Sequence, residues 1–558
     1  MSVDTFDFII VGGGLAGSAL ASRLQQGSPS LSILIIEAGA DVSGRTDVLD
    51  GSQWLSLLGS DLDWAYNTVP QRHVNDRILL NHAGKALGGG SVTNAGVWTR
   101  GDKENYDKWA ELVDDPRWGY TGLLPYFRKV ETYHDPNGNP KTQGFYGPIK
   151  TESSADRHYP LHEQVKKAWA DIGIPYKPSM NDGNPVGLGQ LIENRVDGVR
   201  QISSLAYDLK NIKVLTNTLV KRVVVSDNNG RKIATGVELA ESNKDEKISN
   251  RIITARREVV VSAGAYRSPQ VLMLSGLGPK EELQRLGIET FVDLPDVGRH
   301  LRDHCYINQW WKLKEPEKGL ALGSPAFNDP AFFKGLPIDF LATNQVPKEG
   351  LLKAIATDYE EAGIDADPKL HELFSQKGHI EIFFMYVGLN QGDPVVVPDG
   401  INVTTATILL LPTSKGSIRL ADTNPKTAPV IDPNYLATEV DRYILREGVR
   451  QVHKVLCDTE IGKSMIASET IESDGRPVTS DSTDEELDDL IRRRLLTMFH
   501  PLGSVSMGKV VDSELRVKGV DRLRVVDASV IPLPISGHIQ SGVYAIAEQA
   551  ADMILASF

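Results

Sequence analysis

FIIVGGGLAG, residues 8–17, is the most informative stretch of this 558-residue sequence. It joins a short apolar run to a glycine turn, and residues 18–24 continue with the alanine- and leucine-rich pattern typical of a helix. Residues 32–37, SILIIE, form a second apolar run that ends in an acid. We therefore predict a strand, a helix and a parallel strand in the first forty residues, the start of a Rossmann-like, doubly wound α/β domain.

The glycine turn predicts a dinucleotide site. Backbone N–H groups at a helix start bind phosphate oxygens when the chain can come close, and glycine permits that approach. Gly12 would form the tight turn, Gly14 would leave room for the pyrophosphate, and Gly17 would let the helix pack on the strand. The expected contacts come from Gly12, Gly14, Leu15, Ala16 and Gly17, with Glu37 accepting hydrogen bonds from the ribose hydroxyls. This pattern alone does not separate NAD from FAD.

Length and charge exclude several classes of protein. A chain of 558 residues exceeds the size of a single hydrophobic core, so at least two domains are expected. The 60 Lys and Arg residues are outnumbered by 73 Asp and Glu, which gives a formal net charge of −13 and disfavours a nucleic-acid partner. The two cysteines, Cys305 and Cys457, suggest neither a disulfide framework nor a metal site.

The sequence also predicts where the protein resides. It contains no apolar run near the roughly 20 residues that a membrane helix needs, so no membrane partner is expected. Its start lacks the basic, apolar and small-residue pattern of a secretory signal. We therefore expect a cytoplasmic protein.

Two kinds of sheet are expected further along the chain. Strand-like runs recur at residues 212–215, 221–226, 234–239, 258–262 and 522–526, so the first sheet would be assembled from distant segments. Between about residues 306 and 495 the pattern changes to alternating runs such as 380–387 and 402–411. This region predicts a second, α+β domain built on an antiparallel sheet. The acidic stretch 480–489 favours the start of a solvated helix.

Further motifs carry a family resemblance. They are GKALGGGSVTNAGVWTRG (84–101), GAYRSPQVLMLSGLG (264–278), VGRHLRDH (297–304), FHPLGS (499–504), LRVVDASVIP (523–532) and GHIQS (537–541). In this order, and together with the N-terminal turn, they resemble the glucose-methanol-choline (GMC) oxidoreductases, FAD-dependent enzymes that act mostly on alcohols. The resemblance covers nearly the whole chain. It implies a discontinuous FAD-binding domain, residues 1–155, 205–305 and 500–558, and a substrate-binding domain, residues 156–204 and 306–499.

The resemblance implies particular cofactor contacts. Asn94, Ala95 and Gly96 would lie against the isoalloxazine ring, and Gly89, Gly90 and Ser91 near the pyrophosphate. The remaining contacts implied are Val220 to the adenine, Asp527 and Ala528 to the ribityl-phosphate region, and Ile539 and Gln540 to the pyrimidine edge of the flavin.

Two positions depart from the family pattern. Gly90 stands where many members have Ser, so one hydroxyl contact to phosphate would be replaced by a backbone N–H. Thr93 stands where members with covalently attached flavin have His. Threonine cannot form that bond, so non-covalent FAD is predicted.

Two histidines are the expected catalytic residues. Oxidation of an alcohol requires a base near neutrality within hydrogen-bond reach of the hydroxyl, and histidine has such a pKa. By resemblance, His500 is the general base and His538 binds the substrate oxygen. His300 and His304 are expected to be structural, and His82 a satisfied polar residue. The pair Ser268-Pro269 predicts a helix start, with Ser268 as the cap.

The reaction and its partners stay partly open at this level. The leading prediction is oxidation of a small-molecule alcohol, in small-molecule or secondary-metabolite biosynthesis, with oxygen or another electron acceptor and a monomeric or homodimeric enzyme. The alternative is a lyase or cyclase of the same fold that uses the histidines for acid-base chemistry alone; a silent flavoprotein is disfavoured because both histidines are present. Candidate aromatic pocket residues, which at strand spacing are more often core, are Trp310, Trp311, Phe383, Phe384 and Tyr386.

Overall fold

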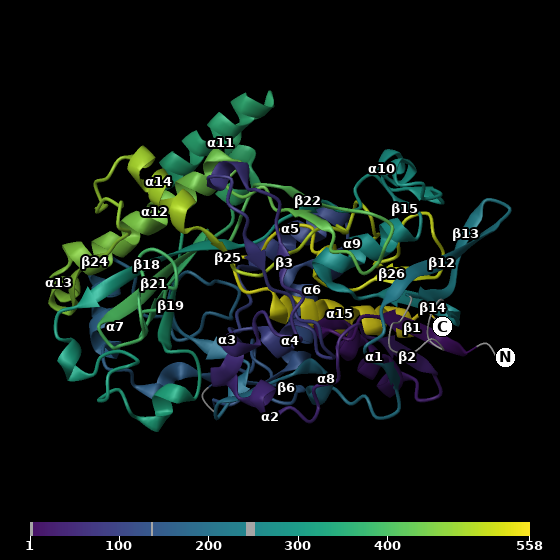
Figure 1. Cartoon of the computed structure of the whole chain (residues 1–558), viewed down its shortest axis with the longest axis horizontal. Coiled ribbons are helices and arrows are strands. Elements are labelled where there is room, and N and C mark those ends of the chain that lie inside the picture. The colour runs from purple at the N-terminus through teal and green to yellow at the C-terminus, as the bar shows by residue number, and fades with distance from the viewer. Residues whose placement is uncertain (1–3, 136–137, 241–250, 558) are drawn as a thin grey trace.

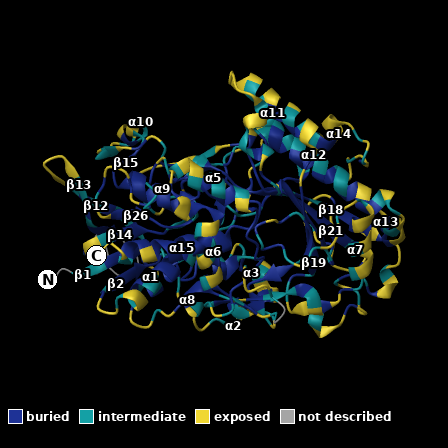
Figure 2. Cartoon of the chain, turned by 180° about the vertical axis from the view of Figure 1, so that it is seen from behind, coloured by how far each residue is buried: buried dark blue, intermediate teal, exposed yellow. Residues whose placement is uncertain are grey.

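The computed structural model describes residues 4–135, 138–240 and 251–557. Two large sheets occupy opposite ends of an elongated molecule, and both termini lie at the end that holds the first sheet (Figure 1). A separate hydrophobic core surrounds each sheet. Buried residues continue from the half of the molecule that holds the first sheet into the half that holds the second (Figure 2). α11 (Lys348–Ala362) projects at the periphery and exposes part of its surface (Figure 2).

The first sheet is assembled from distant segments, as predicted. Its strand order is β11-β2-β1-β14-β13-β12, and β26 pairs with β14. Strands β11, β2, β1, β14 and β26 are parallel to their partners, whereas β12 and β13 form an antiparallel extension. The strands are β1 (Thr5–Val11), β2 (Ile33–Ile36), β11 (Lys213–Leu215), β12 (Val220–Asn228), β13 (Arg231–Leu239), β14 (Ile252–Val261) and β26 (Leu523–Val525).

Two helices bring the chain ends together beside this sheet. α1 (Leu15–Gly27) follows β1 through the glycine turn, and α15 (Gln540–Leu555) packs against it. The predicted strand–helix–strand unit is therefore present, and the C-terminal helix lies on the N-terminal one.

The second sheet is antiparallel throughout, in the order β24-β18-β21-β20-β19-β7, with β25 paired to β18. Asn308 pairs with Ala406, and Ala406 pairs with Phe383, so these three residues share one face. α12 (Glu439–His453) packs on β20 and β21. The strands are β7 (Gly187–Gln190), β18 (Cys305–Leu313), β19 (Ile338–Asn344), β20 (Ile380–Met385), β21 (Asn402–Leu409), β24 (Ile466–Thr470) and β25 (Leu496–Thr497).

Shorter elements connect and cover the two sheets. The other helices are α2 (Thr46–Leu49), α3 (Trp54–Leu57), α4 (Gly90–Thr93), α5 (Lys103–Val113), α6 (Tyr120–Val130), α7 (His162–Asp171), α8 (Ser203–Ala206), α9 (Gly264–Leu274), α10 (Lys280–Arg285), α13 (Glu460–Met465) and α14 (Asp484–Arg494). The small strands are β3 (Tyr66–Asn67), β4 (Leu80–Asn81), β5 (Glu131–Tyr133), β6 (Ile149–Ser153), β8 (Ile192–Glu193), β9 (Arg195–Val196), β10 (Val199–Arg200), β15 (Leu277–Gly278), β16 (Val292–Asp293), β17 (Arg299–Leu301), β22 (Gly416–Arg419) and β23 (Val430–Asp432). Within the described ranges, no helix is long and apolar enough to cross a membrane.

The predicted helix start at Ser268-Pro269 is wrong. α9 already begins at Gly264, so Pro269 lies inside the helix. Proline lacks the N–H that would bond the Ala265 carbonyl, and the Ser504 hydroxyl donates to that carbonyl instead, at 2.5 Å. The Ser268 hydroxyl donates to Asp527 at 2.5 Å and ties the helix to the segment that follows β26. Tertiary hydrogen bonds therefore override the local capping signal.

Candidate functional site

One cavity of about 560 Å³ lies where residues of both sheets meet. Its lining contains both predicted catalytic histidines, His500 and His538. It also contains most of the predicted cofactor residues: Gly12, Gly14, Leu15, Ala16, Glu37, Gly89, Gly90, Asn94, Ala95, Gly96, Val220, Asp527, Ala528, Ile539 and Gln540. Segments more than 500 residues apart in the sequence thus meet around a single space.

Two predicted cofactor residues lie outside this lining. A Cβ on Gly17 would be 2.0 Å from the Gly12 carbonyl oxygen, so Gly17 allows the helix to pack closely on the turn. The Ser91 hydroxyl donates to the Gly88 carbonyl at 2.6 Å and accepts from the Ser203 N–H at 3.0 Å. Ser91 is fully buried and links two loops behind the cavity wall.

The glycine end of the cavity suits a phosphate group. α1 begins at Leu15, and its cap residue Gly14 provides no side-chain hydrogen bond to the first turn. Gly89 approaches this turn so closely that a Cβ on it would be 2.7 Å from the Gly14 Cα. The uncapped helix start therefore faces the cavity with its backbone N–H groups and the positive end of its dipole.

Glu37 is held rigidly at the same end. Its two carboxylate oxygens accept from Gly13 N–H at 2.9 Å and Gly39 N–H at 2.7 Å. Burial raises the pKa of this carboxyl, and the hydrogen bonds from the backbone oppose that shift. An acid fixed beside the glycine turn is suited to accept from ribose hydroxyls. Together the uncapped turn, the fixed acid and the continuous cavity that reaches the histidines fit FAD.

The two predicted catalytic histidines stand together at the other end. The ring centroids of His500 and His538 are 4.8 Å apart, and the ring planes are nearly perpendicular, at 80°. The His538 backbone N–H donates to Thr99 Oγ1 at 2.7 Å, and the His500 backbone N–H donates to Asp303 Oδ1 at 2.7 Å. The backbone that carries each imidazole is therefore fixed by a hydrogen bond to a buried polar side chain.

His304 is part of this cluster. Its Nδ1 lies 3.0 Å from Nδ1 of His500, and it is completely buried. Burial, with a smaller effect of His538, lowers its pKa to about 3. The sequence prediction treated this histidine as structural, and nothing in its loop motif indicated the contact. His300 is bonded to Asp296 at 2.6 Å, and His82 to Asp63 at 2.5 Å.

Glu381 was also not anticipated from the sequence. This buried residue of β20 lies 2.9 Å, through its Oε1, from Nε2 of His538. Residues Ile380–Met385 read as an ordinary apolar strand, in which an acid at the second position carries no signal by itself. Its role becomes visible only when β20 is placed opposite the GHIQS segment.

Burial sets the protonation state of the proposed base. It lowers the pKa of His500 well below the ordinary value, and the charges of His538 and His304 add to the effect. His500 is therefore neutral near pH 7 and has a nitrogen lone pair available. Asp303, beneath it, is buried and accepts from Thr497 and Tyr435, and desolvation raises its pKa to about 6.

Of the five aromatic candidates for the pocket, Phe383 lines the cavity. Trp311, Phe384 and Tyr386 are buried core residues, and the Trp310 indole donates to the Leu389 carbonyl at 3.2 Å. Strand alternation explains why Phe383 lines the cavity and its neighbour Phe384 does not, because successive side chains of one strand point to opposite faces.

Comparison with known proteins gives a consistent picture. Two family models described as GMC oxidoreductase match residues 6–306 and 412–547. The GMC-type oxidoreductase acuG of Aspergillus aculeatus is 40% identical over 99% of both chains, and pyranose dehydrogenase 3 of Leucoagaricus meleagris is 31% identical over 99% of this chain and 93% of its own. A structure of formate oxidase from Aspergillus oryzae, studied for its FAD modification, superposes with a TM-score of 0.87 at 30% identity, covering 100% of this chain and 99% of its own.

Proposed function

The chain belongs to the GMC oxidoreductase family, and from this we propose that it oxidises the CH–OH group of a small-molecule alcohol to a carbonyl, with FAD as cofactor. The observation that carries the proposal is the pair of facing imidazoles, His500 and His538, in the same cavity as the glycine turn. We assign residues 1–155, 205–305 and 500–558 to FAD binding and residues 156–204 and 306–499 to substrate binding.

His500 is the base in this proposal. FAD, when bound, supplies the acceptor for the hydride that leaves the carbinol carbon. The hydroxyl proton goes to Nε2 of His500, because Nδ1 of that ring already lies 3.0 Å from His304. His304, with a pKa of about 3, stays neutral and accepts the Nδ1–H. It thereby keeps the Nε2 lone pair available for the substrate.

His538 holds the substrate oxygen. Its Nε2 lies 2.9 Å from the Glu381 carboxylate, which favours a proton on that nitrogen and fixes the plane of the ring. Nδ1 faces the substrate oxygen and must carry a hydrogen to donate to it, because the single hydroxyl proton goes to His500. The backbones of Ile539 and Gln540, at the start of α15, line the cavity beside it and would contact the flavin.

We further propose that FAD is bound without a covalent link. Thr93 lines the cavity at the position where covalently attached members have His, and a threonine side chain cannot form that bond. The electron acceptor is oxygen or another acceptor, as the names of the oxidase and dehydrogenase relatives suggest. Monomer or homodimer, cytoplasmic location and a role in small-molecule biosynthesis remain predictions from the sequence.

His500→Ala tests the proposal. The variant should retain FAD, because His500 lies at the far end of the cavity from the glycine turn, and its flavin should be reduced by alcohols about 10²- to 10⁴-fold more slowly. Anaerobic stopped-flow absorbance measures that rate. His300→Asn is the matched control, since His300 is bonded to Asp296 and lies outside the cavity lining, and asparagine tolerates its φ of +59°.

The same experiment distinguishes oxidation from the alternative function, a lyase or cyclase. A lyase or cyclase using these histidines would turn over its substrate while the flavin spectrum stayed oxidised. Flavin reduction by an alcohol in the wild type, lost in His500→Ala, supports oxidation. Equal reduction rates in the two proteins would remove His500 from the mechanism.

A further inference from the structure

We propose that the substrate is a neutral, largely apolar alcohol, about as long as a single ring, that donates a hydrogen bond to Asn308 at its far end. This inference rests on the proposed oxidation of an alcohol at the histidine pair. It goes further by assigning the polarity and length of the molecule and by excluding sugars and quaternary ammonium alcohols such as choline.

The wall beyond the histidines is an apolar sheet face. Along β20, Glu381 contacts His538, and the alternate residues Phe383 and Met385 continue the same face outward. Ala406 of β21 lies beside Phe383 in the register. Phe383, Met385 and Ala406 all line the cavity. A molecule leaving the histidines along this face meets hydrocarbon.

The route to solvent is apolar as well. Val387 and Leu389 extend the row past the end of β20, and Trp54 and Leu55 come from α3. Leu55 is 49% exposed and Leu389 is 40% exposed, so both lie where the cavity opens. Exposed leucines at a cavity mouth favour entry of an apolar molecule.

Charged groups are confined to the other parts of the lining. Among the lining residues that the structure describes, the carboxylates are Glu37 and Asp527, which bond to the backbone of Gly13 and Gly264 near the glycine turn. Glu381, the acid beside His538, is already bonded to that ring. No carboxylate of the described lining therefore faces the apolar end to form an ion pair with a cationic substrate.

Polar groups at the apolar end are few, and one of their oxygens accepts no hydrogen bond. Asn308 and Tyr306 lie on the same face of β18 and their side chains hydrogen-bond to each other, and Thr404 donates its hydroxyl to the Val387 carbonyl at 2.7 Å. Oδ1 of Asn308 is buried and accepts no hydrogen bond within the described residues. A buried acceptor without a donor is costly, so a ligand hydroxyl or N–H is its expected partner.

Strand geometry gives the length. Asn308 pairs with Ala406, and Ala406 pairs with Phe383, which is two residues beyond Glu381 on β20. At about 3.3 Å per residue this places Asn308 roughly 7 Å along the sheet from the level of the Glu381–His538 contact, about the length of one aromatic ring. A sugar ring of that length would leave most of its hydroxyls against hydrocarbon.

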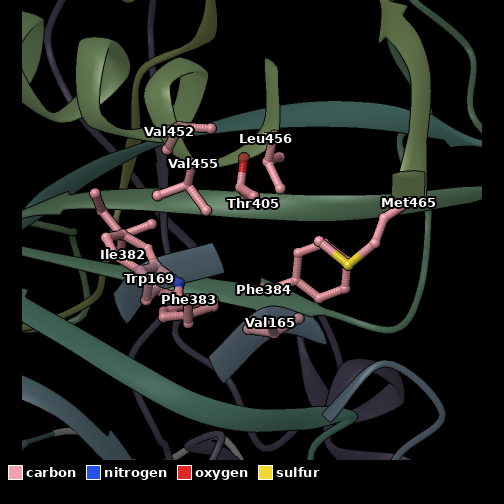
Figure 3. Close-up of a pocket in the computed structure, with 10 residues that line it drawn as sticks. All are labelled: Val165, Trp169, Ile382, Phe383, Phe384, Thr405, Val452, Val455, Leu456 and Met465. Atoms are coloured by element: carbon pink, nitrogen blue, oxygen red, sulfur yellow. The ribbon is translucent and has the colours of Figure 1, made fainter. Parts of the chain in front are cut away.

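The opposite face of the same sheet offers no competing site. Ile382, Phe384 and Thr405 point there and enclose a void of about 10 Å³ with residues of α7 and α12 (Figure 3). That volume is close to the minimum for one water molecule, and the walls are almost entirely apolar. It is a packing defect, and the substrate face is the one toward the histidines.

The test uses one-ring probes that differ at one heavy atom. These are benzyl alcohol with a hydroxyl, or with a methyl group, at the para position; D-glucose and choline are the polar comparisons. The holoenzyme should be reduced by both benzyl alcohols at concentrations far below those needed for glucose or choline. The hydroxyl probe should be preferred roughly fivefold to tenfold, as expected for one hydrogen bond to a buried acceptor.

Variants assign the preference to Asn308. Asn308→Leu should abolish the preference for the hydroxyl probe, and Asn308→Asp should improve reduction by choline relative to the methyl probe. Lys312→Leu, an exposed position of the same strand, is the control and should keep the wild-type ratio. Binding of the corresponding amides, which no oxidation consumes, is measured by calorimetry so that affinity is read without turnover.

The outcomes separate this inference from the proposed function. If the amides bind with the expected preference while no alcohol reduces the flavin, the oxidation fails and the inference about ligand class stands. If glucose or choline reduces the flavin at lower concentration than the benzyl alcohols, the oxidation stands and this inference is overturned. An unchanged probe ratio in Asn308→Leu would also overturn it.

Discussion

The hydrogen bond between the Nδ1 atoms of His304 and His500 requires one ring to donate and the other to accept. If His500 takes the substrate proton on Nε2, its Nδ1 must carry hydrogen, and His304 is the acceptor. The low pKa of His304 keeps that acceptor free of a proton. His304 is therefore a positioning residue that selects the reactive tautomer of the base.

His304→Leu should slow flavin reduction at least tenfold, because His500 then loses the partner that fixes its tautomer and its ring orientation. His304→Gln should recover part of the rate, since its amide oxygen can accept the same hydrogen. Stopped-flow reduction rates are the measurement, and ¹⁵N NMR of the imidazoles reports the tautomer independently. Wild-type rates in both variants would show that the contact has no role in positioning.

The lowered pKa of His500 makes a prediction about pH. A base must be deprotonated to work, so the rate falls only when pH drops below the pKa of the base. Burial places that pKa well below the ordinary histidine value of 6.5. Between about pH 6.5 and pH 8, above the pKa of about 6 of the neighbouring Asp303, the rate of flavin reduction should therefore stay constant. An acid limb centred at 6.5 or higher would contradict the burial argument.

Residue types in motifs were enough to predict His500 and His538, because each lies in a motif that carries the family resemblance. The roles of His304 and Glu381 could not be predicted from the sequence, for a physical reason. Each acts through a contact between segments about 150 to 200 residues apart, 157 for Glu381 and His538 and 196 for His304 and His500. Only the fold creates such contacts, and no spacing in the sequence records them.

At the scale of elements, the start of α1 and the loop before α4 act as one unit. Gly89 adopts φ of +51°, and a Cβ on it would be 2.7 Å from the Gly14 Cα. Gly90, one residue on, has ordinary room, with Leu15 Cδ1 at 3.5 Å from the position of an added Cβ. The family resemblance shows Ser at this second position in many members, and the geometry explains why that is tolerated.

Gly89→Ala should lower the free energy of unfolding by about 1–3 kcal/mol through backbone strain, and it should weaken FAD binding by pushing the two segments apart. Gly90→Ser is the matched control and should fold with wild-type stability and bind FAD at least as tightly. Thermal unfolding and flavin titration of the apoprotein measure both effects. Equal FAD affinity in Gly89→Ala and the wild type would show that this close approach does not shape the site.

Local signals predicted the start of a helix whose cap is local and misplaced the start of one whose cap is not. Thr483 and Glu486 form a reciprocal capping box at the start of α14, within the acidic stretch that predicted a helix. α9 begins instead at Gly264, whose N–H donates to Asp527 at 2.9 Å, from a segment 263 residues away. A cap supplied by a distant segment gives no signal in the sequence next to the helix that it stabilises.

At the scale of the whole molecule, the site exists only because both sheets contribute to it. The sequence predicted two kinds of sheet, from the apolar runs of the first and the alternation of the second. It could not predict the face of the second sheet that turns toward the glycine turn, since strand alternation is the same from either side. The pairing of Glu381 with His538 is the contact that fixes this orientation in the structure.

This shared cavity predicts how the protein responds to loss of FAD. Because residues from Gly12 to Val543, from both sheets, line the same space, a ligand there stabilises the whole fold rather than one domain. Acid precipitation should release the flavin into the supernatant, since Thr93 provides no covalent link. Apoprotein prepared under milder conditions should unfold at lower temperature in calorimetry, and free FAD at 100 times its Kd should restore about 2.7 kcal/mol. A yellow acid pellet would contradict the non-covalent site, and two transitions of which FAD shifts only one would show that the cavity belongs to a single domain.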